Sequence, residues 1–441
     1  MKLLLMKLFL EYIRVLAKLQ LLKTKPMVIG LTGSAGKTST LNAIEAILKD
    51  LPDKKIKISH KANSEVGLPL NILGITVKDF SLKSWVKIFF LAGWKVLTNW
   101  EKIDIYVAEM GIDSPYPPKN MSYLLSFLQP KIGIFLNVSA VHSEAFDHLV
   151  KETDPAKKTQ AVTQQIALEK GKLIKSLKAN NTAILNFDDP VVAQFGPQTQ
   201  AKTITFGTKS ANLILKTWEP SITGTKFTYL YQNKTYQLNF KDFVLPKKFG
   251  YSLAAAITTG LAIGMGIEKI ISSLEKNLVI PPGRSTLLSG INNTYILDSS
   301  YNSSLDPALE MLALLDKIAP KRKIAILGDM REMGDEAELA HLQLIESAIN
   351  KVDLLLLVGP LMSKYSKTFN SKKLQLFNTA QQAVEFLKPQ LIATDTILVK
   401  ASQNSLLLEI AVEQLLANPT DINNLCRRGT NWDKLRNKLI N

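Results

Sequence analysis

The chain has 441 residues, of which 46% are hydrophobic and 21% charged, a composition typical of a globular protein with two or three domains. Its single cysteine, Cys426, excludes an internal disulfide, so we expect a reducing compartment and a cytoplasmic location. The formal net charge of +16 favours phosphate-bearing ligands, and we expect no nucleic-acid partner because the sequence carries no nucleic-acid recognition motif.

Residues 1–26 are predicted to form an amphipathic N-terminal helix. Nearly every residue of the first 22 is apolar, except for charged side chains that fall within roughly 60° of one another on a helix, namely Lys7, Glu11, Arg14 and Lys18. These charges recur too often for a membrane span. Two interpretations stay open: the helix packs on the protein's own core, or it lies in a membrane interface at the inner face of the membrane. Residues 85–100 have a similar character and would extend the same patch.

Residues 27–48 predict a strand, a glycine-rich loop and a helix, in that order. The loop residues that we expect to bind the phosphates of a nucleotide are Gly33, Ser34, Ala35, Gly36, Lys37, Thr38 and Ser39. Glycines let backbone N–H groups turn toward a phosphate chain, and the N-terminus of the helix adds partial positive charge. Lys37 would contact the outer phosphates, and the Thr38 hydroxyl would ligate Mg²⁺.

This loop is shorter than the usual P-loop. The usual spacing, G-x-x-x-x-G-K-[ST], needs a glycine at the position of Leu31, whereas this chain has G-x-x-G-K-T starting at Gly33. The prediction of a phosphate-binding loop therefore depends largely on the strand before it and the helix after it. The alternative is a glycine turn with a solvated lysine.

Strand-like and helical runs alternate from Met27 to about Val279, which predicts a mostly parallel sheet with helices on both faces. Its expected strands are 27–31, 103–109, 132–137 and 182–186. Four runs between about 203 and 243 predict an antiparallel β insert. Pro281-Pro282-Gly283-Arg284 predicts a junction, so we assign 27–284 to a central P-loop ATPase domain and 285–441 to a Rossmann-like α/β domain. The expected strands of the second domain are 294–298, 323–327, 353–358 and 396–400.

Three further side chains complement the loop. Glu109 ends an apolar strand, where a Mg²⁺ ligand belongs beside a P-loop. His142 follows the next strand, although a loop histidine without a ligand is the more common reading of its position alone. Arg284 could clamp a phosphate from the Pro/Gly junction, or it could be a solvated linker arginine.

Ten short motifs then occur in the order of a known family. They are TGSAGKTS, NSEVGLPL, AEMG, NVSAVHSEAF, ALEKGKL, NFDDP, PPGR, DSSYN, LGDMREMG and LVKAS. From about Met27 to Ser402 the chain thus resembles the Mur ligases, the ATP-dependent amide-bond-forming enzymes of peptidoglycan precursor synthesis. DSSYN and LGDMREMG, with His341, are most similar to the member that adds D-alanyl-D-alanine.

The resemblance implies that ATP phosphorylates a substrate carboxylate and that an amine then attacks the acyl phosphate. Lys37, together with Mg²⁺ on Thr38 and Glu109, would neutralise the charge of the transferred phosphoryl group. By the same resemblance, His142 would hold a second Mg²⁺. Lys170 matches a lysine that the family carbamylates with CO₂.

Sequence alone makes Lys170 an ordinary surface lysine, and Lys157 and Lys158 are poorer rivals for the carbamylated position. The resemblance also implies the remaining site residues. Asn63, Glu65 and Gly67 match a loop that approaches the substrate, Asp298, Tyr301 and Asn302 match a motif near the nucleotide and the amino substrate, and Ser402 matches a position that binds the incoming amino component. The alternatives are a turn before a helix for the first set and a strand-end turn for the second.

Three departures from the family pattern stand out. Gln403 replaces an arginine that would recognise the carboxylate of the incoming dipeptide, and a His-Asn signature expected near residues 248–252 is missing. We also expect the leading domain that holds the UDP end of the substrate to be absent.

The predicted function is therefore ligation of D-alanyl-D-alanine, or a similar amine, to a peptidoglycan precursor by a monomer that uses ATP and Mg²⁺. A folylpolyglutamate-synthase-like ligase is the nearest alternative. A nucleotide-binding, membrane-associated scaffold is an alternative from another class.

Overall fold

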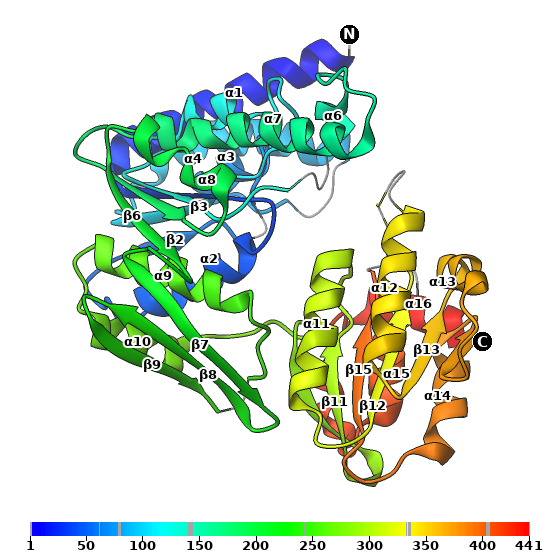
Figure 1. The fold of residues 1–441 in the computed structure, drawn as a ribbon. Coiled ribbons are helices and arrows are strands. Elements are labelled where there is room, and N and C mark those ends of the chain that lie inside the picture. Colours follow the sequence, from blue (N-terminus) through cyan, green and yellow to red (C-terminus); the bar gives the residue numbers. More distant parts are fainter. Residues whose placement is uncertain are drawn as a thin grey trace. The chain divides into compact units, whose positions relative to one another are not determined.

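The computed structural model describes residues 2–60, 62–77, 81–139, 144–241, 243–331, 333, 337–402 and 406–440. The chain divides into two compact units. The first comprises Met1–Lys216, Thr228–Leu238 and Phe249–Val279, and the second comprises Thr217–Phe227, Asn239–Lys248 and Ile280–Asn441. Figure 1 shows the elements of both units along the chain, coloured from the N-terminus to the C-terminus.

The sheet that begins in the first unit has the strand order β2-β3-β1-β4-β5-β6-β7-β8-β9. Its strands are β1 (Met27–Thr32), β2 (Ile56–Ile58), β3 (Ile105–Glu109), β4 (Ile132–Phe135), β5 (Thr182–Asn186), β6 (Lys202–Gly207), β7 (Leu213–Ser221), β8 (Gly224–Tyr231) and β9 (Lys234–Phe240). All pairings from β2 to β6 are parallel, as the alternation of strands and helices predicts. The central strand β1 lies between β3 and β4.

The predicted antiparallel insert is wrong for its first strand. β6 pairs in parallel with β5 and, over two residue pairs, in parallel with β7. The chain between β5 and β6 passes through α8 (Pro190–Ala193) and the short helix η1 (Gly196–Gln198), which together return it to the same end of the sheet. β6 is therefore a further strand of the parallel sheet. The two-residue connections between β7, β8 and β9 are those of hairpins, as predicted.

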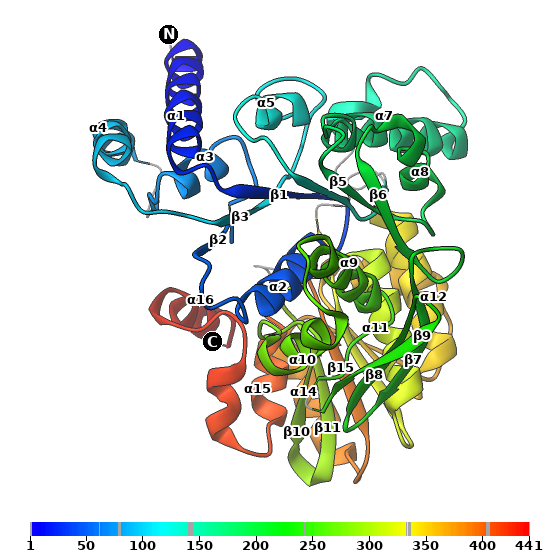
Figure 2. The same ribbon diagram turned by 90° about the vertical axis from the view of Figure 1, so that its left-hand side faces the viewer.

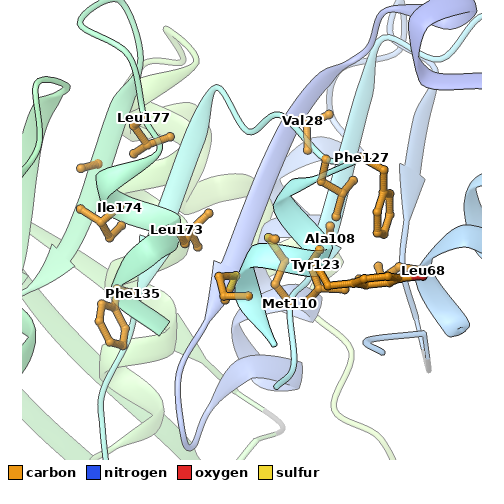
Figure 3. Close-up of a cluster of buried hydrophobic side chains, with 14 of the residues drawn as sticks. Val28, Leu68, Ala108, Met110, Tyr123, Phe127, Phe135, Leu173, Ile174 and Leu177 are labelled. Atoms are coloured by element: carbon orange, nitrogen blue, oxygen red, sulfur yellow. The ribbon is translucent and has the colours of Figure 1, made fainter. Parts of the chain in front are cut away.

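Helices cover both faces of the parallel strands (Figure 2). They are α1 (Lys2–Thr24), α2 (Lys37–Leu48), α3 (Gly67–Ile72), α4 (Leu82–Thr98), α5 (Met121–Leu125), α6 (Glu144–Asp147), α7 (Pro155–Lys175), α9 (Phe249–Ala262) and α10 (Ile267–Asn277). α2 packs on α9 and α10 at one face, and α7 packs on β1, β4 and α5 at the other. Figure 3 shows the core between α7 and the sheet, where Leu173, Ile174, Leu177 and Phe135 belong to one cluster of buried hydrophobic side chains.

α1 packs on the protein's own core, as one of the two interpretations of this segment predicts. Ile13 and Ala17 are fully buried, and Leu10 belongs to a cluster that α1 shares with α3 and α4. Phe9 and Tyr12 of α1 make ring contacts with α4. Within the described residues, none of the helices combines the length and the apolar character that a membrane crossing requires.

The second unit has a sheet of order β10-β11-β15-β12-β13-β14. Its strands are β10 (Thr286–Gly290), β11 (Thr294–Ser299), β12 (Lys323–Gly328), β13 (Leu354–Val358), β14 (Leu374–Phe377) and β15 (Thr396–Lys400). β10 is antiparallel to β11, and the other pairings are parallel. The four strands predicted for this domain are observed as β11, β12, β13 and β15.

Two hydrophobic clusters lie on opposite faces of this sheet. The helices of the unit are α11 (Leu305–Ile318), α12 (Ala337–Lys351), α13 (Pro360–Tyr365), α14 (Ala380–Leu387), α15 (Glu409–Leu415) and α16 (Thr430–Ile440), with short 3₁₀ helices at Ile291–Asn293, Ser366–Thr368, Lys388–Gln390 and Pro419–Asn424. α11 and α12 contribute to one cluster, and α14 and α15 contribute to the other. This sheet with helices on both faces confirms the predicted α/β class.

Candidate active site

The predicted phosphate loop lies at the carboxyl end of the central strand β1. β3 and β4 flank β1 on its two sides, so the strand order reverses here, and open parallel sheets bind ligands at such a point. Helix α2 begins at Lys37, directly after Gly36. Gly36 has a φ of 79°, in the left-handed region that glycine adopts without strain. The loop therefore has the strand–turn–helix geometry that its sequence predicts.

A side chain that the sequence analysis did not single out holds this loop in place. The amide oxygen Oδ1 of Asn137, just after β4, accepts hydrogen bonds from the backbone N–H groups of Ser34 at 3.1 Å and Ala35 at 2.8 Å. Its Nδ2 donates to the Ala35 carbonyl at 3.0 Å. Asn137 belongs to the motif NVSAVHSEAF. Its position just after a strand that neighbours the loop is the feature of the sequence that could have identified it. It fixes the loop through backbone atoms alone.

Lys37 folds back over its own loop. Its Nζ donates to the carbonyl oxygens of Gly33 at 2.8 Å and Ser34 at 3.3 Å. Burial lowers the pKa of Lys37, and the nearby carboxylates of Glu109 and Asp113 oppose this shift. The amine thus lies among the groups that would surround the phosphates of a nucleotide.

Glu109 ends β3 beside the loop, as predicted, and β1 and β3 pair so that Leu31 is opposite Glu109. Its carboxylate accepts hydrogen bonds from the Thr38 hydroxyl at 3.4 Å and from Asn63 Nδ2 at 3.3 Å. Glu109 is 7% exposed, and its backbone N–H donates to Ser59 Oγ at 2.8 Å. The structure therefore brings Thr38, Glu109 and Asn63 together.

Lys170 lies in α7, far from the loop in sequence, yet its Nζ donates to the Gly33 carbonyl at 3.0 Å. The side chain is 6% exposed, so it is not a surface lysine. Burial, together with the neighbouring charge of Lys37, lowers the pKa of Lys170 to about 7, while Asp113 opposes the shift. The sequence identified Lys170 only through the family motif, because periodicity alone does not show which sheet edge a helical lysine reaches.

The residues around Thr38 suit a magnesium ion. Mg²⁺ is usually held by one or two carboxylates, waters and substrate phosphates rather than by a cage of protein ligands. Glu109 and Thr38 supply one carboxylate and one hydroxyl, and no cluster of three or more His, Cys, Asp or Glu side chains that could hold a metal occurs in the part of the chain that the structure describes. His142, the predicted second ligand, lies outside the described residues.

The predicted substrate loop precedes α3. Asn63 contacts Glu109 through its side chain, and its carbonyl accepts from the Gly111 N–H at 2.9 Å. Glu65 lies two residues before α3, and Gly67 is the first residue of that helix, with its N–H donating to Ser64 Oγ at 3.1 Å. Asn63 and Gly67 therefore lie in a turn that leads into a helix, as the alternative interpretation has it, and this turn reaches the strand end at Glu109. Contact of these residues with the substrate stays a prediction.

The remaining predicted residues belong to the second unit. Arg284 lies over the ring of Tyr301, with its guanidinium carbon 4.6 Å from the ring centroid. Arg427, which the sequence analysis did not single out, lies over the same ring at 5.5 Å and pairs with the buried carboxylate of Glu409 at 2.6 Å. Arg284 thus contacts an aromatic ring while its side chain is exposed, and its binding of a phosphate stays a prediction.

Asp298 and Lys400 are buried at the ends of the adjacent strands β11 and β15. Burial raises the pKa of Asp298, whose Oδ1 accepts from the Ser300 N–H at 3.0 Å. Its other oxygen, Oδ2, has no hydrogen-bond partner among the described residues. Burial, together with the charge of Arg284, lowers the pKa of Lys400 to about 7, while Asp298 opposes the shift. Lys400 Nζ donates to the Asn302 carbonyl at 2.9 Å.

Ser402 lies just beyond β15, as its motif predicts. Its hydroxyl donates to the Ser303 carbonyl at 2.8 Å and accepts from the Arg331 N–H at 2.9 Å. His341 is fully buried, and its Nε2 accepts from the Met330 N–H at 3.0 Å, so this histidine supports the fold. Gln403, which stands in place of the family's arginine, lies outside the described residues.

Comparisons with known proteins show which family this chain is similar to. Residues 31–259 match a model described as the Mur ligase middle domain, and residues 283–403 match one described as the Mur ligase, glutamate ligase domain. The UDP-N-acetylmuramoyl-tripeptide–D-alanyl-D-alanine ligase of Synechocystis is 26% identical over 404 residues, which cover 90% of this chain and 76% of that protein. The Escherichia coli enzyme of the same name is 26% identical over 414 residues, covering 89% and 77%.

Among solved structures, the MurF ligase from Thermotoga maritima in complex with ADP has a TM-score of 0.72 and 23% identity, and the match covers 92% of this chain and 82% of that one. It shows the fold. The middle-domain match alone covers more than half of the chain, and the two matched segments contain both groups of site residues. This protein therefore belongs to the Mur ligase family, the ATP-dependent amide-forming ligases that its motifs predicted.

Proposed function

We propose that this protein joins D-alanyl-D-alanine to the peptide of a UDP-N-acetylmuramoyl precursor of peptidoglycan, in the cytoplasm. The observation that carries the proposal is the convergence of Lys37, Thr38, Glu109 and Lys170 on one phosphate loop. The names of the relatives supply the substrates.

In the first step, an oxygen of the substrate carboxylate attacks the γ-phosphorus of ATP, and the bond to the β-phosphate oxygen breaks. The products are an acyl phosphate and ADP. Such a transfer is accelerated mainly by positioning and by neutralisation of the transferred charge. The backbone N–H groups of the loop and Lys37 lie where they would bind these phosphates. Mg²⁺ held by Thr38 and Glu109 would neutralise phosphate charge when bound.

In the second step, the amine of the incoming component attacks the acyl carbon, and a tetrahedral intermediate forms. The carbon–oxygen bond to phosphate then breaks, phosphate leaves, and the nitrogen loses a proton. For the second unit, we propose that Arg284 and Asp298 bind ligand groups near Tyr301 and Asn302, because Asp298 keeps a buried acceptor oxygen free among the described residues. Ser402 would contact the incoming component.

The carbamylation of Lys170 is part of the proposal. Only a neutral amine attacks CO₂, and a pKa of about 7 leaves a large neutral fraction at physiological pH. The nitrogen of the neutral amine forms a bond to the carbon of CO₂ and releases one proton, so the neutral amine becomes a carbamate anion beside the loop. That anion would accept a hydrogen bond from groups around a magnesium site.

Release of phosphate from ATP tests the proposal. We expect release only when a UDP-N-acetylmuramoyl tripeptide and D-alanyl-D-alanine are both present. Release that needs glutamate and a folate would favour the folylpolyglutamate-synthase-like alternative. Nucleotide binding without hydrolysis under any of these conditions would favour the scaffold. Contact with a membrane and a monomeric state are further predictions for this protein.

A further inference from the structure

The helices α1 and α4 expose apolar side chains next to each other. On α1, Leu5, Leu8 and Leu22 are about 55–60% exposed, and on α4, Phe90, Trp94 and Leu97 are 64–72% exposed. On a helical projection, the three α1 residues lie on the side opposite to the buried Leu10, Ile13 and Ala17. We call these six exposed side chains the α1–α4 surface. Large apolar side chains grouped in this way mark an interaction site more often than a solvated face.

Direct contacts hold the two helices against each other. The rings of Tyr12 and Phe89 stack at 4.4 Å between centroids, and the Tyr12 hydroxyl donates to the Phe89 carbonyl at 3.0 Å. Lys23 Nζ donates to the Val96 carbonyl at 2.6 Å and lies 4.2 Å over the ring of Trp100. These contacts lie on the sides of the helices that face each other. The α1–α4 surface is therefore presented by two helices that are fixed in one arrangement.

The charge around this surface is positive. α1 contains five basic residues and one acidic residue, and α4 contains three basic residues and none that is acidic. The acidic residue, Glu11, pairs with Arg14 of the same helix. Lys7, Lys18 and Lys87 are exposed and have no ion-pair partner in the described part of the chain. Lys7 and Lys18 lie at the edge of the apolar stripe on α1.

We infer that the α1–α4 surface docks on an anionic lipid bilayer. Apolar and aromatic side chains bordered by lysines are the composition of helices that lie in a membrane interface, where the apolar groups enter the acyl boundary and the lysines contact headgroups. A second copy of this chain fits less well, because the same uncompensated lysines would face one another. No described helix is long and apolar enough to cross, so the contact is with the membrane surface. This inference does not depend on the proposed ligase activity.

Flotation of the full chain with vesicles tests the inference. We expect binding to phosphatidylcholine vesicles that contain phosphatidylglycerol, little binding to pure phosphatidylcholine, and a loss of binding with rising salt. The tryptophan emission should shift to shorter wavelength on binding, because Trp94 and Trp100 are 64% and 74% exposed. A wild-type chain that fails to float with the anionic vesicles would overturn the inference.

Two sets of variants separate the contributions of the lysines and of the apolar side chains to vesicle binding. The triple change Lys7→Glu, Lys18→Glu and Lys87→Glu should lower binding at least tenfold, since each lysine near an anionic surface contributes roughly fivefold. The triple change Phe90→Ser, Trp94→Ser and Leu97→Ser should lower it by a similar factor. The matched controls change exposed lysines elsewhere, Lys209→Glu, Lys234→Glu and Lys321→Glu, and exposed apolar residues elsewhere, Leu376→Ser and Ile392→Ser.

Melting temperatures close to that of the wild type would show that the variants fold. Binding that both sets of variants retain, or that the control variants lose equally, contradicts the inference. Light scattering tests whether a second copy of the chain binds to this surface instead. A wild-type dimer that the apolar triple variant converts to a monomer would assign the surface to a second copy and overturn the membrane inference.

Discussion

Two lysines share one carbonyl oxygen in the loop. The Nζ atoms of Lys37 and Lys170 lie 2.8 Å and 3.0 Å from Gly33 O, so their charges repel each other in a partly desolvated site. This repulsion adds to burial in lowering the pKa of Lys170 to about 7. Lys170 is thereby suited to react as a neutral amine, whereas Glu109 and Asp113 oppose the lowering of the pKa that burial causes at Lys37.

Replacement of Lys37 by alanine removes the cation that would stabilise the transferred phosphoryl group. We expect phosphate release to fall on the order of 10³-fold, with little change in melting temperature. Lys54→Ala, which changes an exposed lysine after α2, is the matched control and should keep full activity. Turnover close to the wild-type rate in the Lys37 variant would contradict the assignment of the site.

The pKa of Lys170 predicts a pH dependence with a definite sign. Below about pH 7 the amine is protonated and cannot attack CO₂, so activity should rise between about pH 6 and pH 8. Removal of dissolved CO₂ should lower the rate, and added bicarbonate should restore it. A Lys170→Met variant should be inactive and should not respond to bicarbonate. A wild-type rate that is indifferent to CO₂ would contradict carbamylation.

The same depressed pKa affects stability. Between about pH 7 and pH 10.5, the unfolded chain binds a proton at Lys170 that the folded chain does not, so this group makes folding more favourable as pH rises. Its burial is most costly below pH 7. The sequence contains nothing that shows this, because the lowered pKa arises first from the burial of Lys170 where α7 packs on the sheet and then from the charge of Lys37.

At the scale of elements, the sequence predicts what local patterns determine. β5 and β15 have the predicted limits, and the apolar run before the loop is β1. The direction of β6 was predicted wrongly, because alternation along a strand does not reveal which neighbour it pairs with or from which end the chain returns. β10 was not predicted at all, because its five residues carry no clear alternation and their partner β11 fixes them.

The hydrogen bonds of Asn137 connect the loop to the end of β4. We expect Asn137→Ala to raise the KM for ATP on the order of tenfold, because two backbone N–H groups of the loop lose their acceptor and the loop loses its order. Kinetics over a range of ATP concentrations would measure this. The exposed Asn180→Ala is the control. An unchanged KM would show that other contacts suffice to order the loop.

At the scale of the whole molecule, the hydrophobic clusters belong to separate units. One set lies around the sheet of the first unit, and another lies on the two faces of the sheet of the second. Two such cores need not unfold in a single step. The sequence predicted two α/β domains, whereas the assignment of parts of β7, β8 and β9 to both units depends on contacts that no local pattern encodes.

Calorimetry should therefore show two overlapping unfolding transitions. ADP with Mg²⁺ should stabilise the unit that contains the loop, by about 3 kcal/mol at a concentration of 100 times the dissociation constant. Lys37→Ala should reduce this shift, and AMP should give a smaller shift because it lacks the outer phosphate. A thermogram that neither nucleotide changes would contradict nucleotide binding at the loop.

The clamp formed by Asn137 has a consequence for how such a sequence can vary. Asn137 forms its hydrogen bonds with main-chain atoms of Ser34 and Ala35. The side chain at position 35 is exposed and takes no part in these bonds. Position 35 should therefore accept many amino acids, whereas position 137 needs a side-chain amide of the length of asparagine. In a saturation library selected for growth, we expect many substitutions to be tolerated at position 35 and almost none at position 137.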